Sequence, residues 1–354
     1  MGIFLLVFTL STDFRGIWIP RWSIPDSKDI FVHLDGKFNH IFLQIFALGQ
    51  AYYPSKYVPS EVESDRWLRE FLDEAHRRKI KVSAWINVFY SWGYAPRTDD
   101  QDHPIIRQPH WYVQDQFERS ILAYDIAELR NLGIEGYYLS PSNVQVRSYL
   151  THIIEEIISH YNFDGIHLDY VRYPSRQFVY DVSLRSKFMR RYYVDPIGLS
   201  TTSELKTRYS LWGYDDLRRR WQEFINTDLT QFIKNLKDNL KQLRPGVELS
   251  VAVKPNYLIA QNDYCQDWVE WLNSGYVDFV CLMAYTRNIE SYLTKTQQAI
   301  QEPHRVTFGL ALYLLSPNEI RRQVELIHSA PYAGVVFFSY KQLKENKKYL
   351  YTLP

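Results

Sequence analysis

Eight short runs of apolar, β-branched and aromatic residues recur along the chain, with stretches of helical periodicity between most of them. The runs lie at residues 15–20, 40–46, 81–87, 165–170, 249–254, 279–285, 307–313 and 334–340. Such runs are typical of strands that are buried on both faces of a parallel sheet. Amphipathic spacing indicates helices at residues 65–78, 143–161, 228–243, 266–274 and 317–328. Eight strands that alternate with helices predict an α/β fold, a single (β/α)8 TIM barrel.

The predicted barrel domain occupies residues 15–354, because no repeat, low-complexity tract or Pro/Gly-rich linker divides the chain. Two connections, residues 89–162 and 174–245, are too long for simple crossovers, and we interpret them as insertions after the third and fourth strands. The second contains charged, aromatic stretches at residues 186–195 and 215–224. These stretches are consistent with a lid or substrate wall, although a solvated helix face is the more usual outcome.

Residues 1–14 are interpreted as a signal remnant or an extra N-terminal segment. The apolar part, residues 3–10, is too short to span a bilayer, and no Lys or Arg precedes it as in a complete signal peptide. A signal remnant would favour an extracytoplasmic protein, either periplasmic or secreted.

Aromatic residues make up 16% of the chain, with 10 Trp and 28 Tyr. Their rings are apolar on the face and polar at the edge, which suits sugars, although a large core also uses aromatics. Because 41 Lys and Arg nearly balance 40 Asp and Glu, no basic region indicates a nucleic-acid partner. The sequence has no HExxH, paired CxxC, GxSxG or GxxxxGK[ST] motif, so we predict no metal site and no cofactor.

Side chains at the carboxyl ends of barrel strands converge on one mouth, where the active sites of this fold lie. Asp169 is the carboxylate that the predicted strands place there, and strand alternation puts His167 on the same face. We therefore predict that Asp169 is the general acid or base. Burial would raise its pKa, whereas a salt bridge to Arg172 would lower it. A structural ion pair with Arg172 or Lys254 is the alternative.

A second carboxylate, which glycoside hydrolysis normally requires, is harder to identify. Asp267 is the best candidate because it opens a helix after the fifth strand and two tryptophans follow it, but it could equally be a helix N-cap. His167 could orient Asp169 or simply be a satisfied core residue. The predicted substrate-binding residues lie at strand ends or in the loops that follow: Trp18, Arg21, Gln44, Trp85, Asn87, His167, Tyr170, Arg172, Asn256, Trp268, Tyr285, Tyr313 and Tyr340.

Several segments in order resemble the glycosyl hydrolase-like 10 family, a group of bacterial glycosidases with a TIM barrel. They are RGIWIP, FNHIFLQIFALGQAYYPSKYVP, EAHRRKIKVSAWINVF, residues 103–111, YYLSPSNVQVRSYL, YNFDGIHLDYVRYP, QDWVEWL, VDFVCLMAYT and GVVFFSY. FDGIHLDYVRYP is the most specific of them. The resemblance implies a barrel that binds a polysaccharide and hydrolyses its O-glycosyl bonds, with bacterial cell-wall glycan as a natural substrate.

The chain is more distantly similar to family 18 chitinases, which carry a DGIDLDWEYP strand and an MAYD strand. Their catalytic Glu falls at Val171, their middle Asp at His167, and the Asp after MAY at Thr286. A chitinase mechanism therefore lacks its usual acid here, unless Asp169 supplies the proton. The sequence thus predicts a glycoside hydrolase, and the alternative is a glycan-binding barrel without catalytic activity.

Overall fold

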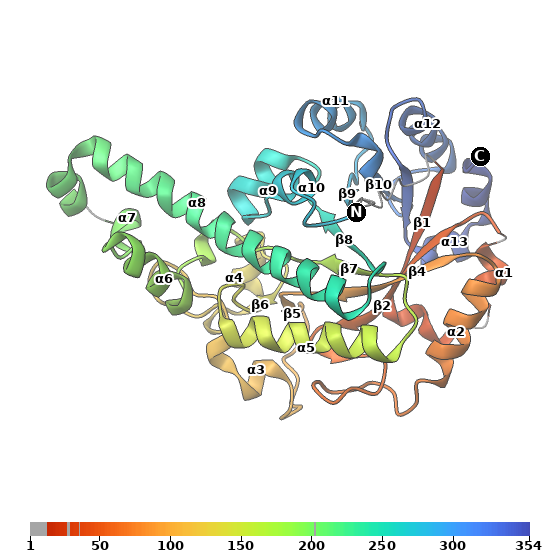
Figure 1. Ribbon diagram of the computed structural model, residues 1–354, viewed down its shortest axis with the longest axis horizontal. Helices are drawn as coiled ribbons and strands as arrows, with labels where there is room; N and C mark the ends of the chain where they lie inside the picture. The colour runs from red at the N-terminus through yellow and green to blue at the C-terminus, as the bar shows by residue number, and fades with distance from the viewer. Residues whose placement is uncertain (1–12, 27–28, 35, 202) are drawn as a thin grey trace, which may run out of the picture.

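The computed structural model describes residues 13–26, 29–34, 36–201 and 203–354. Within these residues, eight parallel strands close into a barrel because β11 pairs with β1 and β1 pairs with β2 (Figure 1). The strands are β1 (Phe14–Ile19), β2 (His40–Ala47), β4 (Lys81–Asn87), β7 (Gly165–Asp169), β8 (Glu248–Val253), β9 (Phe279–Met283), β10 (Val306–Ala311) and β11 (Gly334–Phe338). All eight predicted strands are present, and the predicted (β/α)8 barrel is confirmed.

Helices cover the outside of the barrel. Those that flank the strands are α1 (Ile30–Leu34), α2 (Arg66–Arg77), α5 (Val144–His160), α8 (Ser203–Leu243), α10 (Trp268–Asn273), α11 (Glu290–Ala299), α12 (Pro317–His328) and α13 (Tyr340–Glu345). The five predicted helices correspond to α2, α5, α8, α10 and α12. Helix α5 begins after Asn143, whose side chain accepts hydrogen bonds from the Gln145 and Val146 amides and caps the helix.

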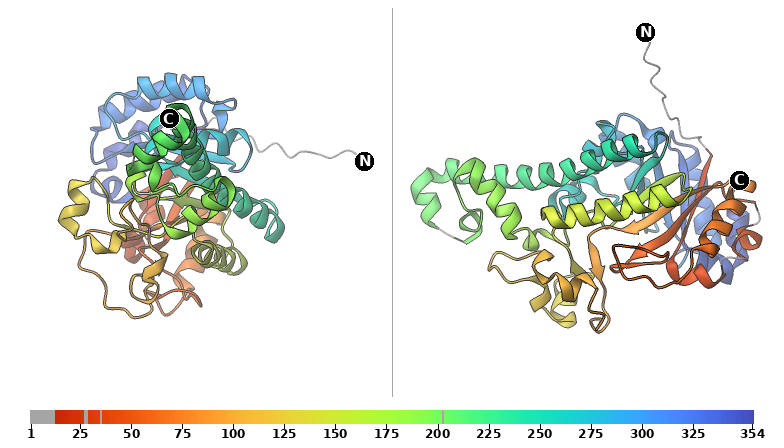
Figure 2. Two further views of the ribbon diagram at one scale, coloured as in Figure 1. Left: turned by 90° about the vertical axis from the view of Figure 1, so that its left-hand side faces the viewer. Right: turned by 60° about the horizontal axis from the view of Figure 1, so that its bottom comes forward.

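The two insertions carry the remaining elements. The first holds β5 (Tyr90–Trp92), α3 (Pro104–Arg107), α4 (Ile126–Asn131) and β6 (Tyr137–Tyr138), and β5 pairs antiparallel with β6. In the second, α6 (Val182–Tyr192), α7 (Gly198–Thr201) and the first half of α8 extend from the barrel as an arm (Figures 1 and 2). Helix α8 begins at Ser203 rather than near residue 228, and its regular course is interrupted at Ser210.

Short elements complete the chain. They are β3 (Gln50–Ala51), α9 (Tyr257–Tyr264) and the 3-10 turns η1 (Arg21–Asp26), η2 (Pro109–Trp111), η3 (Ile121–Ala123), η4 (Arg176–Phe178), η5 (Pro303–Arg305) and η6 (Lys347–Thr352). The N-terminal segment predicted at residues 1–14 lies almost wholly outside the described residues, and β1 begins at its last position. No helix in the described part of the chain is both long and apolar enough to cross a bilayer.

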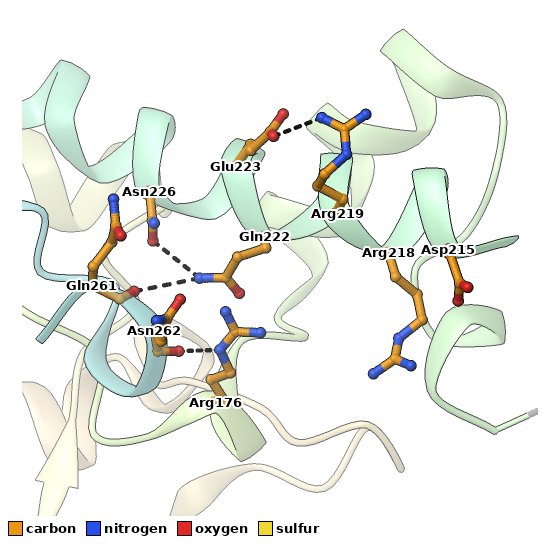
Figure 3. Close-up of a pocket in the computed structure, with 9 residues that line it drawn as sticks. All are labelled: Arg176, Asp215, Arg218, Arg219, Gln222, Glu223, Asn226, Gln261 and Asn262. Carbon is orange, nitrogen blue, oxygen red and sulfur yellow. Dashed lines mark hydrogen bonds and ion pairs between the residues drawn. The ribbon is translucent and has the colours of Figure 1, made fainter. Parts of the chain in front are cut away.

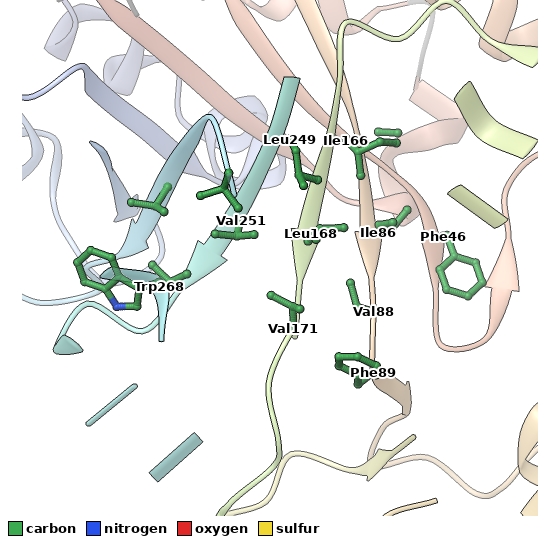
Figure 4. Packing of buried hydrophobic residues seen from close by; sticks show 14 of the residues in the cluster. Phe46, Ile86, Val88, Phe89, Ile166, Leu168, Val171, Leu249, Val251 and Trp268 are labelled. Atoms are coloured by element: carbon green, nitrogen blue, oxygen red, sulfur yellow. The ribbon is translucent and has the colours of Figure 1, made fainter. Parts of the chain in front are cut away.

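The hydrophobic core has two parts, one on each face of the barrel strands. Each strand is therefore buried on both faces, which explains its continuous apolar run. One part fills the space between strands and helices, and Figure 4 shows Ile166 and Leu168 of β7 packed in it beside Val88 and Val171. The other fills the barrel interior and includes Trp18, Phe42 and Trp85. Gly309 makes room there, because a Cβ at this position would lie 2.8 Å from the Trp18 ring. The barrel is therefore a packed body whose chemistry must lie at its mouth.

Candidate active site

Asp169 ends β7 at the mouth, and its side chain is only 8% exposed. The Trp85 indole nitrogen donates to Asp169 Oδ2 at 3.1 Å, and the Tyr170 amide donates to Oδ1 at 2.8 Å. Burial raises the pKa of Asp169 to about 6, although these two hydrogen bonds and the nearby charge of Arg172 partly oppose the shift. Asp169 is thus a carboxyl group that still holds its proton in mildly acidic solution.

Glu135 supplies a second carboxylate near Asp169, and the sequence reasoning did not single it out. It lies between α4 and β6 in the first insertion. Arg172 Nη2 donates to Glu135 Oε1 at 3.0 Å, the Tyr138 hydroxyl donates to Oε2 at 2.8 Å, and Lys254 Nζ lies 3.8 Å from Oε1. Burial works to raise the pKa of Glu135, but the two cations and the hydrogen bonds outweigh it and hold the pKa below its usual value.

Arg172 pairs with Glu135 from within the wall of the mouth. Its side chain is 2% exposed, and its guanidinium lies 4.9 Å from the ring centroid of Tyr170 and 5.0 Å from that of Tyr264. Arg172 and Lys254 were the alternative ion-pair partners predicted for Asp169. Both pair with Glu135 instead, which leaves Asp169 to be governed mainly by burial.

Aromatic side chains surround Asp169 at the rim of the mouth. The Phe338 ring lies 5.6 Å from Tyr285, 6.2 Å from Tyr313 and 6.4 Å from Trp85, measured between centroids. Tyr313 is the exposed member, at 58%. Burial, with a smaller contribution from the charge of Asp169, raises the pKa of Tyr285 well above its ordinary value. The rim therefore offers aromatic faces to a ligand that reaches Asp169.

On the other side of the mouth, Tyr170 stacks on Tyr90 of β5, with ring centroids 4.4 Å apart. Polar groups from β2 and β4 continue this wall. Gln44 Nε2 donates to Asn87 Oδ1 at 3.2 Å, and the Arg21 amide donates to Gln44 Oε1 at 3.2 Å. Nine of the predicted site residues thus lie at or beside the mouth: Asp169, Arg21, Gln44, Trp85, Asn87, Tyr170, Arg172, Tyr285 and Tyr313.

Asn256 caps α9, because its side chain accepts hydrogen bonds from the Leu258 and Ile259 amides. Trp18 and His167 are buried side chains of the barrel interior. The Trp18 indole donates to His167 Nε2 at 3.1 Å, and His167 Nδ1 lies 2.8 Å from Ser250 Oγ. Trp18 is 2% exposed and His167 is fully buried, so neither ring presents a face to the mouth. Burial holds the pKa of His167 well below its ordinary value, so it is the neutral core residue of the two alternatives.

Asp267, Trp268 and Tyr340 make hydrogen bonds within the fold. Asp267 caps α10 by accepting from the Glu270 amide, and Gln261 Nε2 donates to its other oxygen at 2.8 Å, which confirms the N-cap alternative. The Trp268 indole is fully buried and donates to the Lys254 carbonyl. The Tyr340 hydroxyl, also buried, lies 2.7 Å from His33 Nδ1 on α1.

Comparison with known proteins identifies relatives that match most of the chain. Residues 13–321 match the model of the glycosyl hydrolase-like 10 family. Glycosyl hydrolase YngK of Bacillus subtilis is 22% identical over an alignment of 358 positions, gaps included, which covers 87% of this chain and 61% of YngK. The chain therefore spans less than two thirds of that relative's length.

Two solved structures share the fold. The glycoside hydrolase domain of PgaB (BpsB) from Bordetella bronchiseptica superimposes with a TM-score of 0.71 at 15% identity, covering 96% of this chain and 97% of that domain. A variant GH18 chitinase from Cycas revoluta superimposes with a TM-score of 0.55 at 12% identity, covering 96% of this chain and all of the chitinase chain. The similarities expected from the sequence motifs are confirmed at the level of the fold.

Proposed function

The chain belongs to the glycosyl hydrolase-like 10 family, and from this membership and the geometry of the mouth we propose that it is a glycoside hydrolase. The proposed substrate is a bacterial polysaccharide, with cell-wall glycan as the first choice. One observation carries the proposal. Two carboxyl groups at the mouth have opposite surroundings: Asp169 is buried beside the Trp85 indole, whereas Glu135 pairs with Arg172, and these surroundings move their pKa values in opposite directions.

Opposed pKa values allow one group to act as an acid while the other is ionised. Asp169, with a pKa of about 6, donates its proton to the glycosidic oxygen as the bond to the leaving sugar breaks. Glu135 is held in the ionised form by Arg172 and Lys254, and its negative charge stabilises the positive charge that develops on the sugar ring. The proton lost by Asp169 is recovered when water adds to the sugar.

The aromatic rim provides the binding surface for this reaction. Sugar rings stack on aromatic faces, and the exposed Tyr313 with the neighbouring Tyr285 and Phe338 offers such faces beside Asp169. The amides of Gln44 and Asn87 supply donors and acceptors for hydroxyl groups on the opposite wall. A neutral, hydroxyl-rich ligand therefore fits the mouth better than a compact anion or an apolar ligand.

The proposal is tested by the release of new reducing ends from a panel of bacterial cell-wall glycans, with and without peptide stems. We compare the native protein with Asp169→Asn, and Asp267→Asn is the matched control because it makes the same chemical change at a helix cap. Turnover by the native protein and the control, but not by Asp169→Asn, would support the proposal. Binding of these glycans without turnover by any of the three proteins would overturn it in favour of a glycan-binding barrel.

A further inference from the structure

A pocket of about 590 Å³ lies away from the mouth, between the arm and helix α9 (Figure 3). The charged side chains that line it are exposed, and Arg219 already pairs with Glu223. At the mouth, by contrast, two of the side chains that bind Glu135 are buried, because Arg172 is 2% exposed and Tyr138 is fully buried. The surroundings of Glu135 are therefore fixed before a ligand binds.

We propose that Tyr138 is a positioning residue of this site, which acts on the sugar only through the Glu135 carboxylate. This inference rests on the proposed function, in which Glu135 stabilises the sugar cation. The Tyr138 hydroxyl donates to Glu135 Oε2 at 2.8 Å, and burial keeps the Tyr138 side chain out of reach of a ligand. Burial also raises the pKa of Tyr138 well above its ordinary value, so the phenol keeps its proton and remains a donor in acidic and neutral solution.

Arg172 alone does not fix the orientation of the Glu135 carboxylate. Its Nη2 donates to both oxygens, at 3.0 Å from Oε1 and 3.3 Å from Oε2. Its Nε and Nη1 have no hydrogen-bond acceptor among the described residues, so the two-nitrogen fork with which arginine holds a carboxylate is not formed. Lys254 Nζ, at 3.8 Å from Oε1, is too distant for a hydrogen bond. A single shared donor lets the carboxylate turn about it, and the Tyr138 hydroxyl is the second fixed point that prevents this.

The backbone at Glu135 is held independently of its side chain. The Tyr90 hydroxyl donates to the Glu135 carbonyl at 3.2 Å. The next residue, Gly136, lies so close to β5 that a Cβ at this position would overlap the Trp92 carbonyl oxygen. Because these contacts fix the main chain, the bond from Tyr138 controls the side chain alone.

Strand β6, which carries Tyr138, is also tied to the strand end that carries Asp169. The Leu139 amide donates to the Phe89 carbonyl at 2.8 Å, and the Val88 amide donates to the Asp169 carbonyl at 2.8 Å. Since Phe89 directly follows Val88, two backbone hydrogen bonds connect β6 to the end of β7. The bond from Tyr138 therefore sets the position of the second carboxyl group relative to Asp169.

The test compares Tyr138→Phe with Tyr90→Phe as the matched control. Both variants lose one hydroxyl that bonds to Glu135, but only Tyr138→Phe frees the carboxylate, because Tyr90 bonds to the backbone carbonyl. The other titratable groups that act on Glu135 are the same in both variants: Arg172, Lys254, Asp169, Tyr170 and Tyr94.

The first measurement is the pH dependence of kcat/KM on a dinitrophenyl glycoside of a cell-wall glycan fragment. This leaving group needs no proton donor, so the fall in activity at acidic pH reports the protonation of Glu135 and not that of Asp169. Loss of a hydrogen bond to the ionised carboxylate should move this fall to higher pH by about one unit in Tyr138→Phe and leave it in place in Tyr90→Phe. An unmoved profile in Tyr138→Phe, or an equal movement in both variants, would overturn the inference.

The second measurement, urea unfolding as a function of pH, does not depend on turnover. Because the folded-state pKa of Glu135 is lowered, this residue contributes stability that is present above its ordinary pKa of 4.5 and is lost as the pH falls through the folded-state value. The loss of stability in Tyr138→Phe should therefore be largest near neutral pH and shrink below pH 4.5. In a Glu135→Gln background the same loss should not vary with pH.

A loss of stability in Tyr138→Phe that is the same at every pH, or that varies equally in both backgrounds, would overturn the inference. Failure of the proposed hydrolase function would appear separately, as a native protein that turns over neither the glycan nor the dinitrophenyl glycoside. The unfolding measurement would then still decide whether Tyr138 acts on the Glu135 carboxylate.

Discussion

Replacement of Asp169 by Asn should make the protein more stable in neutral and weakly alkaline solution, because Asn imitates the neutral form that burial favours. The pKa of this carboxyl is 3.8 in the unfolded chain and about 6 in the fold. Between these values the folded state binds more protons than the unfolded state, so the native free energy of unfolding falls as the pH rises. With about 1.4 kcal/mol for each pH unit, the loss approaches about 3 kcal/mol above pH 6. The Asn side chain does not ionise, so Asp169→Asn does not lose stability as the pH rises through this range.

The assay is urea unfolding of both proteins at a series of pH values from about 3 to 8. At the acidic end, where native Asp169 is protonated in both states, the variant should be less stable by about 1 kcal/mol, because its amide nitrogen cannot accept one of the two hydrogen bonds that Asp169 accepts from Trp85 and Tyr170. The variant should gain over the native protein as the pH rises, up to about 3 kcal/mol near pH 8. All other titrating groups are common to both proteins and cancel in the difference. A difference in free energy of unfolding that does not change with pH would refute the account of Asp169.

Three further predictions concern the pH dependence of turnover, the hydrogen bond from Trp85 and the helix cap at Asp267. Glycan turnover should fall as the pH rises through about 6, because Asp169 then loses the proton that it must donate. Trp85→Phe should move this fall in activity to higher pH, because it removes a hydrogen bond that favours the ionised form of Asp169. The pH dependence of kcat/KM measures both effects, and an unmoved limb in Trp85→Phe would contradict the second. Asp267→Ala should lose about 1 kcal/mol of stability through loss of the α10 cap, with kcat unchanged. Thermal unfolding and steady-state kinetics check this, and a large drop in kcat would restore Asp267 as a catalytic residue.

The barrel could be predicted from the sequence because its strands are buried on both faces. Each strand therefore appears as a continuous apolar run, and the helices between them keep an apolar stripe. The start of α8 could not be predicted in the same way. Its first half belongs to the arm, where charged residues such as Arg218 and Arg220 interrupt the apolar periodicity. The apolar pattern of the sequence predicts an element correctly where that element is buried in the core.

The site could be predicted only in part, for two physical reasons. Strand alternation predicts that a side chain points into the barrel, but it does not predict how far that side chain lies from the mouth along the barrel axis. Trp18 and Trp85 were therefore both predicted to bind substrate. Trp18 lies in the packed interior against His167, whereas Trp85 reaches Asp169. Glu135 lies in an insertion, and only the folded chain brings that loop onto Arg172. The signal available in the sequence was an acid just before two tyrosines, in a long connection that leaves a strand end.

The division of work between Asp169 and Glu135 is tested most directly by their response to the leaving group. Aryl glycosides with an acidic phenol leave without help from a proton donor, whereas natural sugars need one. Asp169→Asn should therefore lose turnover of the glycan but retain turnover of a dinitrophenyl glycoside of the same sugar. Glu135→Gln should lose both, because it removes the charge that stabilises the sugar cation. Equal loss of both substrates in Asp169→Asn, or full activity in Glu135→Gln, would contradict the assignment.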